Sequence, residues 1–98
     1  MEPQAMKYRD DTELARRAAT GDLAAWHEFV LRYSALIRVI VRRYYPGWPE
    51  DDQLNVYVGV LEYLHAQGLD RYDGRAALST WVMTVTRSRC CDALRHEL

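Results

Sequence analysis

Hydrophobic residues recur at spacings of three and four along nearly the whole chain, and no segment alternates as a half-buried strand would. The longest series covers residues 23–44 and predicts a helix of about 22 residues, roughly 33 Å long. Asp22 can cap its N-terminus, and Pro46 and Pro49 end it. The predicted apolar face of this helix consists of Leu23, Trp26, Phe29, Val30, Tyr33, Leu36, Ile37, Ile40, Val41 and Tyr44.

A shorter helix is expected before this one, near residues 11–20. Asp10 and Glu13 have the spacing of a capping box, and Gly21 is a natural C-terminal stop. Residues 1–10 then form a polar leader, and residues 11–98 form one helical domain.

A third helix is predicted from Glu50 to about residue 67. Glu50, Asp51 and Asp52 place negative charge at its start, where the helix dipole favours it, and Gly68 ends it. Its predicted buried stripe consists of Leu54, Tyr57, Val58, Leu61 and Leu64.

The last third of the chain predicts a loop over residues 69–75 and a fourth helix from about Ala77 to His96. The clearest inward positions of that helix are Leu78, Trp81, Val82 and Val85. The expected fold class is therefore all-α, a compact bundle of about four helices with short connections.

The composition suits a single globular domain, since the 98 residues are 49% hydrophobic and 28% charged. No apolar run approaches the roughly 20 residues of a membrane span, and the first residues lack the profile of a signal peptide. We therefore expect a soluble cytoplasmic protein without a membrane partner. Cys90 and Cys91 are neighbours, which disfavours a disulfide between them, so they are read as reduced thiols.

The net charge of −1 hides an uneven distribution along the chain. Residues 1–28 sum to −2, residues 29–49 to +4, residues 50–73 to −5 and residues 74–98 to +2. A basic face for an anion and an acidic face for a basic partner can thus coexist on one small domain.

Enzymatic motifs are missing from the sequence. It has no Gly-rich phosphate loop, no nucleophile elbow, no Cys with an obvious His partner and no His-Glu-x-x-His. We therefore expect no catalysis, no cofactor and no metal site. The triplet from Glu50 to Asp52 could bind a cation, but a cap that compensates the helix dipole is the favoured interpretation.

One side of the fourth helix is polar and basic. Thr84, Arg87, Ser88 and Arg95 lie at helical spacings, next to the aromatic residues Tyr72 and Trp81. Cations, hydrogen-bond donors and a flat ring are what a protein needs to bind partly opened nucleic acid. From the spacing alone, a solvated helix face with the Trp81 ring in the core is the favoured interpretation.

Three groups of residues occur in an order and at separations that match a known family. They are Glu13-Leu14 with Gly21-Asp22 and the run Trp26 to Tyr33, then Glu50-Asp51-Asp52-Gln53-Leu54-Asn55, and finally Trp81-Val82 followed by Asp92-Ala93-Leu94-Arg95. With them the chain resembles the region 2 domain of bacterial sigma factors, in particular the extracytoplasmic-function group of the sigma-70 family, from Asp11 to about Leu98.

The resemblance implies a role in transcription initiation with two binding surfaces. In the family, the acidic signature on the third helix docks on a coiled coil of the largest RNA polymerase subunit, which maps here to Asp51, Asp52 and Asn55. The loop and the fourth helix of the family bind the non-template strand of the minus-ten promoter element as the duplex opens. The matching positions here are Asp70, Arg71, Tyr72, Arg75, Trp81, Thr84, Arg87 and Ser88.

Further arginines are candidates for neutralising phosphates, which would make binding salt-dependent. They are Arg38, Arg42, Arg43, Arg87, Arg89 and Arg95.

Departures from the family pattern affect both surfaces. Asn55 replaces the usual Gln, Ser88 replaces a common Asn, and Gly59 inside a helix suggests close packing or local loosening. The helix-turn-helix domain that follows in the family is absent from this chain, so we expect an excised domain rather than a complete small protein.

Two alternatives to the DNA-melting role stay open. The first is a sigma-like interaction module that binds polymerase or an anti-sigma factor without opening DNA. The second is a structural bundle with no role in nucleic-acid binding.

Overall fold

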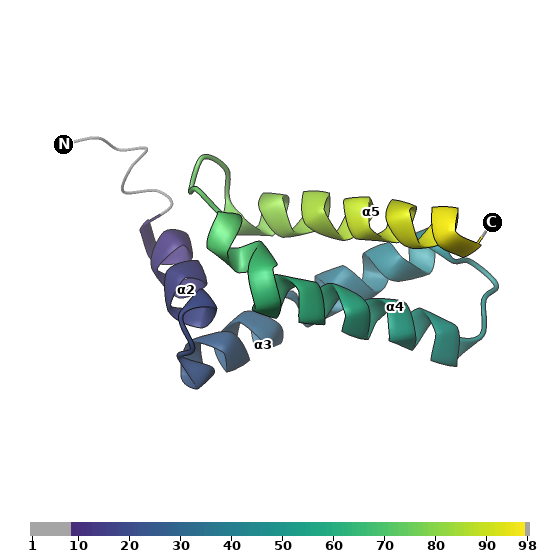
Figure 1. Cartoon of the computed structure of the whole chain (residues 1–98), viewed down its shortest axis with the longest axis horizontal. Helices are drawn as coiled ribbons and strands as arrows, with labels where there is room; N and C mark the ends of the chain where they lie inside the picture. Colours follow the sequence, from purple (N-terminus) through teal and green to yellow (C-terminus); the bar gives the residue numbers. More distant parts are fainter. Residues whose placement is uncertain (1–8, 98) are drawn as a thin grey trace.

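The protein is described over residues 9–97 by a computed structural model, and this part of the chain folds into four α-helices without a strand (Figure 1). The all-α bundle predicted from the hydrophobic pattern is therefore confirmed. The helices are α2 (Arg9–Ala19), α3 (Leu23–Tyr44), α4 (Glu50–Tyr63) and α5 (Leu78–Glu97), and two short segments follow α4, η1 (Leu64–Gly68) and η2 (Leu69–Arg71).

The junction between α2 and α3 forms largely as the sequence predicts. Gly21 has a φ of +96°, which suits glycine at the end of a helix. Asp22 caps α3, because its side chain accepts a hydrogen bond of 3.1 Å from the Ala25 N–H. Arg17 also binds the Asp22 carboxylate, at 2.6 Å. Both hydrogen bonds lower the pKa of Asp22, the one from Ala25 most.

The start of α2 differs from the prediction. The helix begins at Arg9, so Asp10 lies in its first turn and is not the cap of a capping box. Of the predicted leader, residues 1–8 lie outside the described residues, as does Leu98 at the other end of the predicted domain.

The third predicted helix continues beyond α4 with altered hydrogen bonding. The Leu69 N–H donates to the Leu64 carbonyl, five residues back, so η1 is a π-helical turn. The next bond joins the Tyr72 N–H to the Leu69 carbonyl at 3.3 Å, three residues back, as in a 3₁₀-helix. The predicted α-helix up to residue 67 and the predicted loop from residue 69 are both wrong at this point, because the chain stays helical to Arg71 with a changed pitch.

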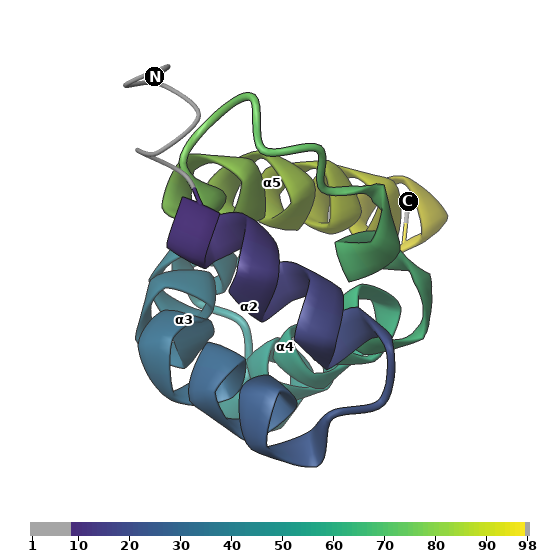
Figure 2. The same ribbon diagram turned by 90° about the vertical axis from the view of Figure 1, so that its left-hand side faces the viewer.

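Helix α3 is the central element, with α2, α4 and α5 packed on it. Seen along the long axis, α2 lies across the end of the other three helices (Figure 2). The core is apolar except for the hydroxyls of Thr86 and Tyr45. The Thr86 O–H donates a hydrogen bond of 2.7 Å to the Val82 carbonyl, and the Tyr45 O–H donates one of 3.1 Å to the Cys90 carbonyl. The largest fully buried side chains are Tyr45, Phe29, Ile37, Leu64, Leu69, Leu78, Val41, Val60, Val82, Thr86 and Cys90.

The predicted buried stripe of the third helix forms only in part. Leu64 is fully buried, and Tyr57 and Leu61 are half-buried against the core. Leu54 and Val58 are 45% and 41% exposed, whereas Val60 is 1% exposed and fills the core. Leu23 on α3 is 74% exposed, which also contradicts its predicted burial. Helix α4 is apolar on nearly all sides, and packing against α3 and α5 selects the face that includes Val60.

The molecule is elongated, with extents of 49 × 25 × 20 Å. The start of α4 lies at one end, and the loop between η2 and α5 lies toward the other (Figure 1). None of the described helices is both long and apolar enough to cross a membrane.

Candidate docking and nucleic-acid surfaces

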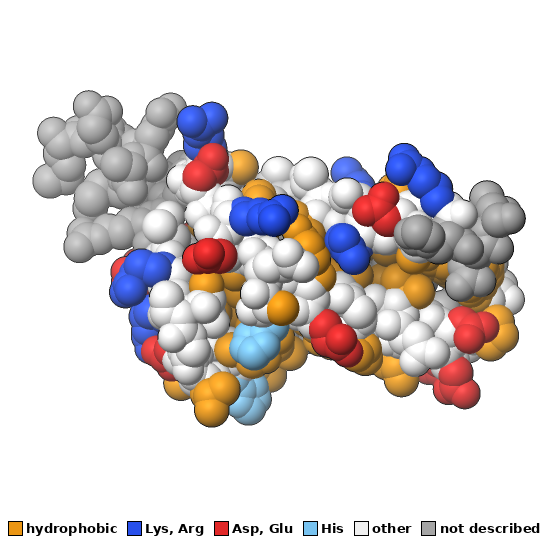
Figure 3. All heavy atoms as spheres, in the orientation of Figure 1, with side chains coloured by type: hydrophobic (Ala, Val, Ile, Leu, Met, Phe, Trp, Pro, Cys, Tyr) orange, Lys and Arg blue, Asp and Glu red, His pale blue; other side chains and the backbone are white. Residues whose placement is uncertain are grey.

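The acidic residues at the start of α4 lie on its solvent-facing side. Asp51, Asp52 and Asn55 are all exposed, and Asp51 and Asn55 are one turn apart. The cap residue Pro49 offers no side-chain hydrogen bond, so the nearby carboxylates are what compensate the positive end of the helix dipole. Figure 3 shows acidic side chains gathered at this end of the molecule. The structure thus presents the three predicted docking residues on one accessible surface.

A groove of about 280 Å³ runs beside this acidic surface, between α4 and α5. Its lining residues are Asn55, Val56, Gly59, Val60, Arg89 and Ala93. A Cβ added to Gly59 would meet no atom within 4 Å, so close packing does not explain this glycine. The Arg89 guanidinium lies 4.5 Å from the centre of the Tyr63 ring, a cation–π contact that fixes one wall of the groove.

The loop before α5 is held by its own hydrogen bonds. The Tyr72 O–H donates to the Ala76 carbonyl at 2.6 Å, and the Asp73 carboxylate accepts a bond of 3.0 Å from the Arg75 N–H. Gly74 adopts a φ of +78°, and a Cβ there would come within 2.8 Å of the Thr12 hydroxyl. A side chain at this position would therefore strain the loop and force the Thr12 side chain to shift.

Helix α2 also supplies the cap of α5. The Leu78 N–H donates a hydrogen bond of 2.9 Å to the Asp11 carboxylate, although the two residues are 67 positions apart. The first turn of α5 contains no acidic residue of its own. Asp11 thus satisfies an otherwise unpaired backbone donor and places a negative charge at the positive end of the helix. Nothing in the local sequence pattern around α5 indicates this partner.

The two aromatic residues predicted for nucleic-acid binding lie together. The ring centres of Tyr72 and Trp81 are 5.4 Å apart, with the planes inclined by 60°. Both side chains are half-buried, and Trp81 packs against the hydrophobic core. The structure therefore combines the two interpretations of Trp81, since the ring is part of the core packing and still has an accessible portion.

The polar residues of α5 lie on its outer side. Thr84, Arg87 and Ser88 are exposed, and the Thr84 hydroxyl donates to the Thr80 carbonyl at 3.1 Å. Asp70 and Arg71 of η2 and Arg75 of the following loop are exposed as well, and the Arg75 side chain is 89% accessible. Six of the eight predicted nucleic-acid residues are thus exposed, and the half-buried pair of Tyr72 and Trp81 links the segment before α5 to this helix.

The candidate phosphate-binding arginines are not gathered with these residues. Arg38 and Arg42 line a groove between α3 and α4, Arg89 faces Tyr63, and Arg95 lies 3.7 Å from Asp92. Only Arg87 lies among the predicted nucleic-acid residues of α5. A single phosphate track over all six arginines is therefore excluded by the fold.

The two cysteines differ in environment. Both are free thiols, with Cys90 buried in the core and Cys91 half-buried. Burial raises the pKa of Cys90 to about 11, so this thiol is neutral at physiological pH. A hydrogen bond with Cys91 and partial burial raise the pKa of Tyr44. Cys90 acts as a packing residue, since its side chain is fully buried in the core where α5 packs on α3.

Comparison with known proteins gives no match, because no family model fits the sequence and no curated protein or solved structure is significantly similar. Over the described residues, no group of three or more His, Cys, Asp or Glu side chains is placed to hold a metal ion. A function must therefore be inferred from the exposed side chains themselves and from the sequence resemblance that they carry.

Proposed function

We propose that this chain is a region 2-type domain of a sigma factor. It docks through the start of α4 on a coiled coil of the largest RNA polymerase subunit and binds the opened non-template strand of the minus-ten promoter element. This function requires binding of DNA but no chemical reaction on it, and it implies a cytoplasmic protein.

One observation carries this proposal. The acidic motif residues Glu50, Asp51 and Asp52 are exposed at the start of α4, whereas Leu14, Phe29 and Val82 of the other motifs are buried in the core. Leu31 and Leu54 of the same motifs are 73% and 45% exposed. The exposed acidic start of α4 supports the proposal, because the resemblance assigns the polymerase contact to these positions.

The docking surface suits a basic helix. Glu50, Asp51 and Asp52 place three negative charges on the exposed start of α4, at the end of the molecule. Charge complementarity of this kind accelerates association and fixes the orientation of partners. Asn55 is one methylene shorter than the Gln of the family, so a contact through its amide requires a closer approach of the coiled coil.

The nucleic-acid surface suits a single strand. Unstacking a base step costs a few kcal/mol, which the protein offsets only by binding the opened strand better than the duplex. The accessible part of the Tyr72 and Trp81 pair offers a surface for an unstacked base, and Arg87 offers a cation for a phosphate. Because Asp11 and Thr12 brace the loop and the start of α5, this surface is formed before DNA binds.

The proposal is tested by fluorescence anisotropy with labelled non-template strands, one promoter-like and one scrambled. Each is titrated with the chain, with and without a polymerase coiled-coil fragment, at two salt concentrations. We expect sequence-selective binding that the coiled coil strengthens. Asp52→Arg should abolish the effect of the coiled coil, and Arg87→Ala should weaken strand binding and reduce the salt slope by about 1.

Matched controls use the same charge changes elsewhere. Glu28→Arg on α3 should leave coiled-coil binding unchanged, and Arg16→Ala on α2 should leave strand binding unchanged, because both residues are exposed and neither is among the predicted docking or strand-binding residues. Coiled-coil binding without preference for any strand would overturn the melting role. It would favour an interaction module, an alternative that the replacement of the family's Asn by Ser88 also favours. Binding to neither partner would overturn the whole proposal.

A further inference from the structure

The glycine in the middle of α4 has no explanation within the fold. Gly59 is exposed and does not have a positive φ, and a Cβ added to it would meet no atom within 4 Å. Glycine inside a helix destabilises the helix relative to alanine. What the missing side chain leaves is open space, because Gly59 lines the groove of about 280 Å³ between α4 and α5.

This groove has one charged lining residue, Arg89 of α5. The other residues that line it are an asparagine and small or apolar residues. Arg89 forms no ion pair with any carboxylate whose side chain the structure describes. Its guanidinium lies 4.5 Å from the centre of the Tyr63 ring, which orients the planar group and leaves N–H groups at its edge available. An arginine in this state is suited to bind a carboxylate.

The two ends of the groove side of α4 carry opposite charges. Asp52 lies seven residues before Gly59 and Tyr63 four residues after it, so the three residues share one side of the helix. Eleven residues of helix place Asp52 roughly 16 Å from the pair of Tyr63 and Arg89. Asn55, a predicted docking residue, lines the groove between these ends. The groove therefore continues the acidic docking surface and ends at a cation.

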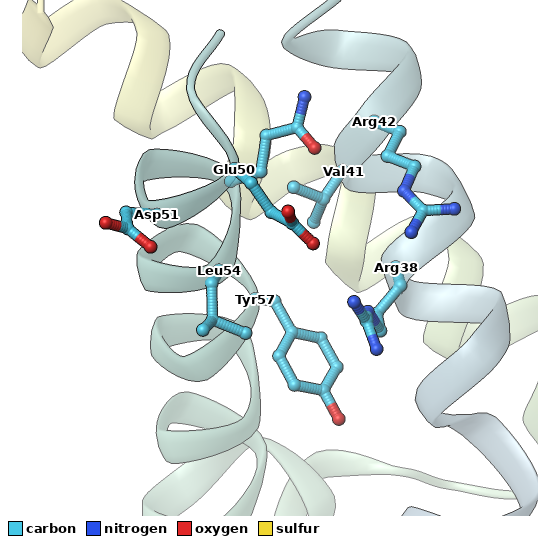
Figure 4. Close-up of a pocket in the computed structure, with 8 residues that line it drawn as sticks. Arg38, Val41, Arg42, Glu50, Asp51, Leu54 and Tyr57 are labelled. Carbon is cyan, nitrogen blue, oxygen red and sulfur yellow. The ribbon is translucent and has the colours of Figure 1, made fainter.

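The groove on the other side of α4, between α4 and α3, has a different character. Its volume is about 260 Å³, and Figure 4 shows Arg38 and Arg42 on one wall and Glu50 reaching in from the start of α4. Asp51 lines it as well. Two cations and two acids offset one another there, so the charge of that groove selects no partner.

We infer that the groove between α4 and α5 receives the partner helix that docks at the start of α4. An apolar side chain of that helix packs on Gly59, and a carboxylate of the same helix binds Arg89. The inference rests on the proposed function and specifies the partner: a helix that is basic where it meets Asp52, apolar in the middle and acidic about three turns away. A nucleic-acid strand suits the groove less well, because its phosphates would also meet Asp52.

The test measures the affinity of the intact chain for the polymerase coiled-coil fragment by fluorescence anisotropy. Gly59→Ala should raise the urea midpoint of unfolding and yet weaken binding at least about threefold, and Gly59→Leu should weaken binding at least about tenfold, because each fills space that the partner occupies. Arg89→Glu should also weaken binding at least about tenfold. General electrostatics predicts the reverse, since a more acidic surface attracts a basic helix more strongly. The sign of this change therefore isolates the carboxylate contact.

Matched variants make the same changes away from the groove. Ala35→Leu adds a similar side chain to an exposed position of α3, and Arg43→Glu makes the same charge reversal near the end of that helix. Neither variant should weaken binding to the coiled coil. Replacing the acidic residues of the coiled-coil fragment by Lys, one at a time, should identify one change that restores binding to Arg89→Glu. All four altered positions of the chain are exposed, so circular dichroism should show folded variants.

The possible failures of this inference and of the proposed function are distinguishable. Full affinity of Gly59→Leu and Arg89→Glu, with binding lost in Asp52→Arg, would overturn the inference and leave the proposed docking intact. Tighter binding by Arg89→Glu would overturn the carboxylate contact. If Arg89→Glu weakens binding to the DNA strands but not to the coiled coil, the groove belongs to nucleic acid. Absence of coiled-coil binding by the original chain would overturn the proposed docking and the inference together.

Discussion

Removing the Asp11 carboxylate is the most informative perturbation of the fold. It accepts a hydrogen bond of 2.9 Å from the Leu78 N–H and so links α2 to the start of α5. A lost N-cap costs about 0.5–2 kcal/mol, and a hydrogen bond to a charged group about 1.5–3 kcal/mol. Because Asp11 is half-buried, we expect Asp11→Ala to lower the free energy of unfolding by about 1–2 kcal/mol.

The control is the neighbouring residue. Asp10 lies in the same turn of α2 and is exposed, so Asp10→Ala loses the same interaction with the α2 dipole but no bond to α5. Its unfolding free energy should change by no more than about 0.5 kcal/mol. Asp11→Asn should fall between the two alanine variants, because the amide oxygen still accepts a hydrogen bond but carries no charge.

Urea unfolding followed by circular dichroism measures these differences directly. In a domain of this size, 1 kcal/mol corresponds to about 4–8 °C in Tm, so thermal unfolding gives an independent check. Amide hydrogen exchange should also accelerate at Leu78 and in the next turn of α5. Equal stability of Asp11→Ala and Asp10→Ala, with unchanged exchange at Leu78, would refute the assignment of Asp11 as the cap of α5.

Three further predictions concern α4, η1 and α5. Gly59→Ala should stabilise the chain by about 0.5–1 kcal/mol in urea unfolding, because the position is helical and open, and a loss of stability would show a hidden contact. Leu64→Ala should cost about 2–5 kcal/mol while Leu54→Ala costs less than about 1, and equal losses would contradict the observed register of α4. Burial raises the pKa of Cys90 from 9.0 to about 11, so the unfolded state loses its proton first as the pH rises. The free energy of unfolding should therefore fall between about pH 9 and pH 11, by about 2–3 kcal/mol at most, and Cys90→Ala should remove that part of the pH dependence.

Sequence periodicity predicts α3 and its cap well because α3 has one clearly apolar side and one charged side. The same reasoning fails for α4, where Leu54, Val56, Val58 and Val60 leave no polar side over two turns. Which face of α4 is buried depends on the side chains of α3 and α5 that pack against it, and no local pattern in α4 contains that information. As a result, the pattern predicts burial of Leu54 and Val58, which are 45% and 41% exposed in the structure.

For the predicted binding residues as well, some features follow from the local sequence and others depend on the tertiary fold. Exposure of Asp51, Asp52 and Asn55 follows from polar residues at a helix start and is accessible to sequence reasoning. The Asp11 contact with Leu78 is not, because it joins residues that only the tertiary fold brings together. The π-helical turn is equally hidden, since Gly68 reads as a stop and nothing indicates an additional residue in the turn.

The π-helical turn of η1 affects where the chain tolerates the deletion of a residue. The bond from Leu69 to Leu64 closes over five residues, one more than in an α-helix, and the additional length lies on the outside, where Ala66 and Gln67 are exposed. Deleting one of them would convert the turn into an α-helical one and keep Leu64 and Leu69 in the core. A deletion within α4 would instead rotate every later side chain of that helix by about 100°. Natural length variation among relatives of this chain should therefore be concentrated at residues 66–67.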